Sequence, residues 1–407
     1  MNDDLTTRLS RQLHEQADDW HGAPLTLEGV RGRARSIRRR RAAVGAGVAA
    51  AAVMAVILPV TLALDGSPDS QRPDVTVTPT EAVDPTPRAD GTFPLTIDVP
   101  EGALPETGYI AIDDDRLVTP DGRFDLPGDF RQVAPYDGGW VGIRAGDLPP
   151  TGHQVVVMDQ DFQEISATSS GGGLAISADG DRVAWVEVDP QNWTLVNAPV
   201  DGGEPIRTPV SEESIPVGFL ADDAVAFSWT DPAAGQVNGG VAYPDGAYDD
   251  PALDGLQRLT GVAAGRVAVQ TEFRGDSSCS EVRDQAGRGE TVWDTCDYQL
   301  RAFSPDGQLV IGYASYFDLG SPTLSILDAA TGDPVVEFAS GNTAPSATVV
   351  HAAVWEDDDT VIAHVEQGGD QTLVRLELNG GLTRVAEIRQ PRDLSLEFFL
   401  PQHVGGL

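Results

Sequence analysis

The chain has 407 residues, and 27 basic residues stand against 63 acidic ones, which gives a formal net charge of −36 at neutral pH. All the basic residues are arginine, so chemistry that needs a lysine, such as a Schiff base or a P-loop, is excluded, and the acidic balance disfavours nucleic acid as a partner. The 44 glycines and 29 prolines indicate a turn-rich globular protein and exclude one built from long helices.

Residues 1–41 form an arginine-rich segment that we expect to be cytoplasmic and partly helical. Leu5, Leu9 and Leu13 recur every fourth residue and fall on one face of a helix. Two roles fit this face: contact with a partner protein, or attachment to the inner leaflet of the membrane. The layout of the chain resembles that of membrane-bound anti-sigma factors, which implies a receptor role. The segment has no cysteine for the zinc signature of that family, so the resemblance is one of layout.

Residues 42–64 are predicted to form a transmembrane helix. They are 23 consecutive uncharged residues, enough to cross a hydrocarbon core of roughly 30 Å. Asp65 follows them, and four arginines precede them: Arg38, Arg39, Arg40 and Arg41. The positive-inside rule then places the N-terminus in the cytoplasm and the C-terminal part outside the cell. The alternative is a cleaved signal peptide, for which both the leader and the apolar run are long.

Residues 65–104 are expected to be an extended linker. The first part of this stretch is rich in Thr, Ser and Asp and contains five prolines, at positions 68, 73, 79, 85 and 87. Such a composition cannot bury a core, so it is typical of a spacer.

Residues 105–402 contain a repeat. Apolar runs are interrupted by polar turns centred on positions 137, 179, 222, 264, 306 and 357, at intervals of 42, 43, 42, 42 and 51 residues. Asp-Gly, present at 179–180 and 306–307, favours a tight hairpin turn because one turn residue needs a positive φ. A period of about 42 residues is that of a four-stranded propeller blade. The sequence therefore predicts an all-β propeller.

The two ends of the repeat region predict a seventh blade. Residues 109–113, 116–119 and 123–126 are three short strands without an inner strand before them, and 396–400 is one strand without followers. Together these four strands would complete one blade, with three strands from the start of the repeat region and one from its end. Closing the ring in this way removes free sheet edges. Six blades with an appendage is the alternative. A β-sandwich would not explain the regular period.

The turn Ser304-Pro305-Asp306-Gly307, repeated at 177–180, resembles the repeat of bacterial WD40-like propellers of the TolB type. The resemblance implies a propeller over residues 105–402 and a binding or scaffolding role. It implies no catalytic residue, and the Trp-Asp and Gly-His signatures of true WD40 blades are missing.

Cys279 and Cys296, the two cysteines of the chain, are predicted to form a disulfide at the base of a hairpin, because both lie on the oxidising side of the predicted membrane. Without histidine neighbours they do not complete a zinc site. Trp293 lies inside this loop, near Phe273 and Tyr298, and the three aromatics are a candidate surface for a sugar or a protein. Packing of Trp293 within the hairpin is the alternative.

No catalytic, cofactor-binding or metal-binding residue is assigned from the sequence. His351 and His364 flank one predicted hairpin and can meet across it, although ordinary strand positions explain them. Acidic runs at 113–115, 249–250 and 357–359 make calcium the single candidate ion, but solvated turns explain these runs better.

We therefore expect a non-enzymatic binding or scaffolding module anchored in the cell membrane, with an envelope protein or a glycan as partner. The alternatives are an envelope hydrolase or lyase that uses acids in the propeller funnel, and a single-pass signalling receptor.

Overall fold

The computed structural model describes residues 86–400, except 147–150, 190–191, 232–235, 264, 275–276, 286–288, 316–319, 342–346 and 392–394. The predicted cytoplasmic segment, the span 42–64 with Arg38 to Arg41, and the first part of the linker lie outside these residues. Within the part of the chain that the structure describes, no helix is long and apolar enough to cross a membrane.

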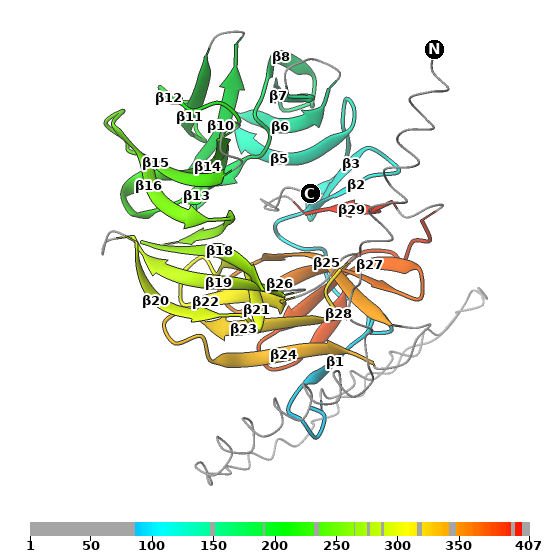
Figure 1. Ribbon diagram of the computed structural model, residues 1–407. Helices are drawn as coiled ribbons and strands as arrows, with labels where there is room; N and C mark the ends of the chain where they lie inside the picture. The colour runs from blue at the N-terminus through cyan, green and yellow to red at the C-terminus, as the bar shows by residue number, and fades with distance from the viewer. Residues whose placement is uncertain are drawn as a thin grey trace, which may run out of the picture. The chain divides into compact units, whose positions relative to one another are not determined.

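The described residues form seven antiparallel sheets, which are the blades of a β-propeller (Figure 1). Blade 1 is β2 (Tyr109–Ala111), β3 (Arg116–Thr119), β4 (Gly122–Asp125) and β29 (Phe398–Phe399). Blade 2 is β5 (Phe130–Tyr136), β6 (Gly139–Ala145), β7 (His153–Met158) and β8 (Glu164–Ser169). Blade 3 is β9 (Ala175–Ile176), β10 (Arg182–Val188), β11 (Trp193–Pro199) and β12 (Ile206–Val210).

Blade 4 is β13 (Ile215–Phe219), β14 (Val225–Asp231), β15 (Gln236–Ala242) and β16 (Tyr248–Leu256), with a short 3-10 turn, η1 (Ala221–Asp223), between its first two strands. Blade 5 is β17 (Arg258–Ala263), β18 (Arg266–Arg274), β19 (Ser277–Asp284) and β20 (Glu290–Thr295). Blade 6 is β21 (Tyr298–Phe303), β22 (Leu309–Ala314), β23 (Thr323–Asp328) and β24 (Pro334–Ser340). Blade 7 is β25 (Thr348–Trp355), β26 (Thr360–Gln367), β27 (Asp370–Glu377) and β28 (Leu382–Arg384).

Both ends of the repeat region meet in blade 1, as the sequence predicts. Strand β29, red in Figure 1, pairs with the cyan strand β2 through Ile110 opposite Phe399 and Ala111 opposite Phe398. The prediction of seven blades is thereby confirmed, and the six-bladed alternative is wrong.

The predicted turns supply the backbone conformations that the hairpins need. Five of the six have a residue with positive φ within or directly beside them: Asp137, Gly180, Asp223, Gly265 and Gly307. The Ser-x-Asp-Gly turns are further held by a short side-chain hydrogen bond, 2.6 Å from Ser177 Oγ to Asp179 Oδ1 and 2.6 Å from Ser304 Oγ to Asp306 Oδ1. The predicted turns thus mark where the second strand of a blade begins.

The hydrophobic core is divided between the blades. Seven clusters of buried apolar residues are present, and each joins two neighbouring blades. Alternate residues of the strands face these clusters, as in β26, where Val361, Ala363 and Val365 pack toward blade 6 and Ile362 toward blade 1. Burial on both faces of each sheet explains why the middle strands are almost continuously apolar.

The end of the predicted linker belongs to the propeller, which corrects the expected boundary at residue 104. Strand β1 (Phe93–Leu95) pairs in parallel with β24, with Phe93 opposite Phe338, as a fifth strand of blade 6. Farther along, Arg384 of β28 exchanges backbone hydrogen bonds with Pro100 and Gly102, each 2.8 Å long. Residues 88–104, here called the strap, therefore run along the outer edges of blades 6 and 7 before the chain enters blade 1.

Candidate functional site

The innermost strands of five blades are interrupted at nearly the same place. A β-bulge shifts the register of β5, β13, β17, β21 and β25 four to six residues before the following turn. The residues at these bulges are Arg131, Val217, Thr260, Arg301 with Ala302, and His351. A bulge bends the strand and redirects the side chain of the extra residue, so these positions differ from the regular alternation of the strand.

A cavity of about 420 Å³ lies where the inner strands of blades 3 to 7 converge. Its walls come from β9, β13, β17, β21 and β25, so it occupies the axis of the propeller. Apolar side chains such as Val217, Phe219 and Trp355 line it, together with the turn residues that follow β9, β13 and β21. The Ser-x-Asp-Gly turns therefore stand at one end of this axial cavity.

Among the residues that the structure describes, Arg301 is the single cationic side chain that lines the axial cavity. Its guanidinium carbon lies 5.6 Å from the centre of the Tyr313 ring, and one terminal nitrogen donates to Gln299 Oε1 at 2.9 Å. Among the described residues no carboxylate forms an ion pair with Arg301, and its Nε is buried without a hydrogen-bond acceptor. Burial lowers the pKa of Arg301, since the charged form loses its hydration there.

The wall around Arg301 is built by close approach of neighbouring strands. A Cβ at Gly261 in β17 would collide with the backbone carbonyl of Arg301, so only glycine lets β17 and β21 approach this closely. On the other side, Trp355 Nε1 donates to the Ala302 carbonyl at 3.0 Å. Arg301 is therefore held between blades 5 and 7 by rigid elements.

Two carboxylates, Asp179 and Asp223, line the end of the cavity formed by the turns, and both are exposed. The hydroxyl of Ser177, followed by the Asp181 backbone N–H, holds the pKa of Asp179 below its usual range. Asp179 is therefore ionised at neutral pH and poorly suited to donate a proton.

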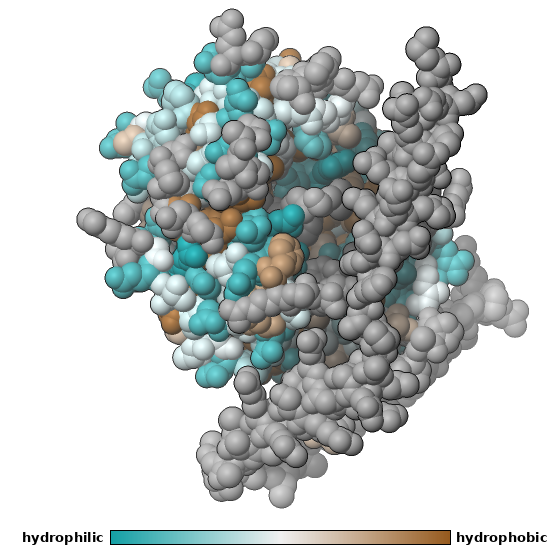
Figure 2. All heavy atoms as spheres, in the orientation of Figure 1, coloured by the Kyte–Doolittle hydropathy of each residue, from teal (hydrophilic) through white to brown (hydrophobic). Residues whose placement is uncertain are grey.

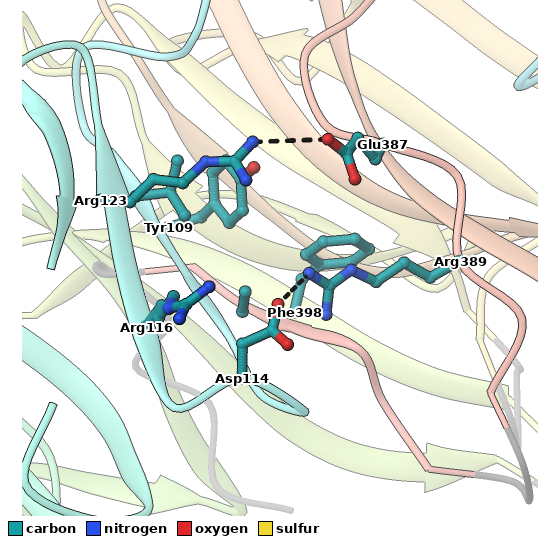
Figure 3. Close-up of a pocket in the computed structure, with 9 residues that line it drawn as sticks. Tyr109, Asp114, Arg116, Arg123, Glu387, Arg389 and Phe398 are labelled. Atoms are coloured by element: carbon teal, nitrogen blue, oxygen red, sulfur yellow. Dashed lines mark hydrogen bonds and ion pairs between the residues drawn. The ribbon is translucent and has the colours of Figure 1, made fainter. Parts of the chain in front are cut away.

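A second, much smaller pocket of about 10 Å³ lies where blade 1 meets the segment after β28 (Figure 3). Three arginines project into this region, and each is matched by a carboxylate: Arg389 with Asp114 at 2.6 Å, Arg123 with Glu387 at 3.4 Å, and Arg116 with Asp125 at 2.7 Å. The volume is that of about one water molecule. The arginines of this pocket are therefore all paired with carboxylates, and the pairs lie where the last part of the chain closes the ring on blade 1.

The histidines His351 and His364 do meet across one hairpin, with ring centres 5.1 Å apart. His351 Nε2 lies 2.9 Å from Glu366 Oε2, and His364 Nε2 lies 2.9 Å from Gln371 Oε1. Gln371 also accepts a hydrogen bond from the backbone N–H of Glu397 at 3.0 Å. These contacts tie blade 7 to the chain segment that enters β29, so we assign the two histidines to the closure.

The predicted disulfide is confirmed: Cys279 in β19 is bonded to Cys296, directly after β20. It closes the base of the β19–β20 hairpin in blade 5, as the spacing indicates.

The three aromatics of the candidate surface do not gather on one exposed face. Trp293 donates from Nε1 to the Ala329 carbonyl at 3.0 Å and so packs against blade 6. Tyr298 belongs to β21 of blade 6 itself and donates to Glu337 of β24 at 3.2 Å. Phe273 is 66% exposed at the end of β18. The described hydrophobic surface forms separate spots among polar residues on the face shown in Figure 2. Trp293 therefore packs against its neighbours and does not form an exposed binding surface with Phe273 and Tyr298.

The acidic runs are engaged in turns and ion pairs. Asp114 pairs with Arg389, Asp249 accepts from the Tyr243 hydroxyl, and Asp358 accepts from the Asp306 backbone N–H. Within the described ranges no group of three or more His, Cys, Asp or Glu side chains is placed to hold a metal ion.

Sequence reasoning missed Arg301. The signal was the broken alternation in Leu300-Arg301-Ala302-Phe303, directly before the best Ser-x-Asp-Gly turn, which places a charge between apolar residues.

Comparisons with known proteins find similarity to solved structures alone. No protein-family model matches the sequence, and neither does any curated protein. The Dos1 propeller aligns at 12% identity over 68% of this chain and 81% of its own length, with a TM-score of 0.46. The β-propeller domain of the Trilobed protease from Pyrococcus furiosus aligns at 12% identity over 63% and 86%, with a TM-score of 0.44.

Prolyl oligopeptidase B from Galerina marginata aligns at 11% identity over 65% of this chain, with a TM-score of 0.44. The alignment covers 43% of the peptidase, so this chain matches less than half of its length.

Proposed function

We propose that this protein is a binding module of the cell envelope, in which residues 42–64 anchor a propeller outside the cytoplasm and the axial cavity receives the ligand. The observation that carries the proposal is the 420 Å³ cavity, which is of the size of small-molecule and peptide sites. Its walls are inner strands of five blades, so the site is rigid before a ligand arrives. An envelope protein or a glycan is the expected source of that ligand.

The cavity lining favours binding over hydrolysis. A glycosidase needs two carboxyl groups, one of them held protonated. The lining contains the carboxylates Asp179 and Asp223, and the pKa of Asp179 is shifted away from a proton donor. A receptor role would depend on residues 1–41, which lie outside the described residues; loss of signalling on deletion of residues 3–20 would support it.

Site-specific photo-crosslinking in cells tests the proposal. A photoreactive residue replaces Ala178, which is exposed in the turn at the cavity, and in a control it replaces Ile165, which is 67% exposed on the outer strand β8. We expect a recurrent adduct from position 178 that is absent from position 165, identified by mass spectrometry. Equal adducts from both positions, or none from 178, would contradict binding at the cavity.

A further inference from the structure

The axial cavity has opposite charges at two places along its wall. Arg301 carries the positive charge in the wall between blades 5 and 7, and Asp179 and Asp223 carry negative charges at the end formed by the turns. Asp179 comes from blade 3, Asp223 from blade 4 and Arg301 from blade 6. The three side chains line one cavity, and no ion pair joins Arg301 to either aspartate among the described residues.

An uncompensated guanidinium is costly on a half-buried side chain whose Nε is fully buried, and the chain as a whole is acidic, with a net charge of −36. Ion pairing would remove this cost, as it does for Arg375, which contacts Glu356 at 2.6 Å. Arg301 is stabilised instead by the Tyr313 ring and by the neutral Gln299 amide. A charge kept unpaired beside an open cavity is suited to a ligand that supplies the missing anion.

From this arrangement we infer that the axial cavity binds a zwitterionic peptide, whose carboxylate pairs with Arg301 while its cationic group faces Asp179 and Asp223. A carboxylate matches the planar guanidinium with two hydrogen bonds. Phosphate has no cationic group to place beside Asp179 and Asp223, and its negative charge is repelled by them. The apolar walls accept the uncharged part of the peptide. The inference rests on the proposed function and names its ligand class.

Calorimetric titration of the full-length protein in detergent micelles tests the inference with four probes: the tripeptide Lys-Ala-Ala, its C-terminal amide, N-acetyl-norleucyl-Ala-Ala, and inorganic phosphate. Lys-Ala-Ala should bind most tightly, and loss of either its carboxylate or its cations should weaken binding by roughly tenfold or more. Equal binding of acid and amide, tighter binding of phosphate, or no binding of any peptide overturns the inference.

The variant Arg301→Gln assigns the effect to the side chain. It should bind the acid and the amide with equal affinity, because the partner of the carboxylate is gone. Its thermal midpoint should stay the same or rise, since an unpaired, half-buried charge has been removed; a residue needed for the fold would show the opposite. The matched control is Arg131→Gln, at the corresponding bulge of blade 2 but outside the cavity lining, which should leave the preference for the acid intact.

The experiments distinguish failure of the proposed binding module from failure of the proposed ligand class. An adduct from position 178 without binding of the peptides would leave the binding module standing and reject the zwitterionic peptide. Absence of the adduct and of peptide binding would reject the binding module and the zwitterionic peptide together.

Discussion

At the scale of single residues, the ion pair of Glu356 and Arg375 organises the outer part of blade 7. Arg375 donates to both oxygens of Glu356, at 2.6 and 2.8 Å, and also to the carbonyl of Ala103 at 3.1 Å. Glu356 in turn accepts from the Glu106 backbone N–H at 2.7 Å. The Glu356 side chain is 6% exposed, so these donors replace the water that would otherwise stabilise the charged carboxylate.

Replacement of Arg375 by Met should lower the free energy of unfolding by about 3 kcal/mol, because it leaves the Glu356 carboxylate buried without its cation. Chemical denaturation of the detergent-solubilised protein measures this. In the control Arg116→Met the partner Asp125 is 83% exposed, and the loss should stay below about 1 kcal/mol. Similar losses for the two variants would show that burial does not strengthen the pair at Glu356.

Single positions differ in how far the sequence predicts them. The cysteine pair could be predicted because a chain with two cysteines has one intramolecular pairing available. Trp293 could not, since its indole contacts the Ala329 carbonyl, 36 positions away in the next blade. The role of Arg301 depends on a bulge, and the residues around a bulge do not show in advance which side chain will turn toward the axis.

At the scale of elements, the strap joins two blades that are already complete. In β1, Leu95 is 2% exposed and packs into the cluster between blades 6 and 7. The ring of Phe93 fills the place of a side chain at Gly380, whose φ of +92° also favours glycine. Pro94 between them points outward, as expected of a proline in an edge strand.

The variant Leu95→Ala should lose about 3 kcal/mol of stability, because it leaves a cavity in a core that cannot collapse freely. Limited proteolysis should then cut within residues 88–104 faster than in the unmodified protein. Pro94→Ala, on the exposed side of the same strand, is the control and should resist cleavage as before. Unchanged proteolysis of the Leu95 variant would mean that the strap is held by its backbone pairing alone.

The four-stranded blades were largely predictable, because each one repeats the same apolar runs and turns. The predicted strands 109–113, 116–119, 123–126 and 396–400 match β2, β3, β4 and β29 within two residues. The strap was not predictable. Its strand has three residues, one of them proline, and it pairs with a partner about 245 positions away, so no local pattern marks it.

At the scale of the whole molecule, stability of the ring depends on the junction of its last blade with its first. Phe398 contacts Tyr109 at 5.6 Å, His364 at 5.4 Å and Arg389 at 5.5 Å, measured to ring centres. The Phe398 ring in β29 thus contacts β2, β26 and the segment after β28. The ionic pairs of Figure 3 surround it.

Replacement of Phe398 by Ala should cost about 4 kcal/mol and open the ring at this junction first. Hydrogen exchange followed by mass spectrometry should show faster exchange in residues 109–125 and 360–389 than in blades 3 to 5. Exchange that rises equally in all blades would indicate that the propeller unfolds as one unit.

The strap also decides where tension enters the propeller. If residues 42–64 anchor the chain in a membrane, as proposed, tension would reach the described residues first at Arg88, bonded to the Ser340 carbonyl at 3.1 Å, and at β1 on blade 6. The outer edges of blades 6 and 7 would then carry the load, while β2 and its partner β29 lie beyond these attachments and would bear little of it. Mechanical failure would begin with peeling of the strap, and the closed ring with its axial cavity would outlast it.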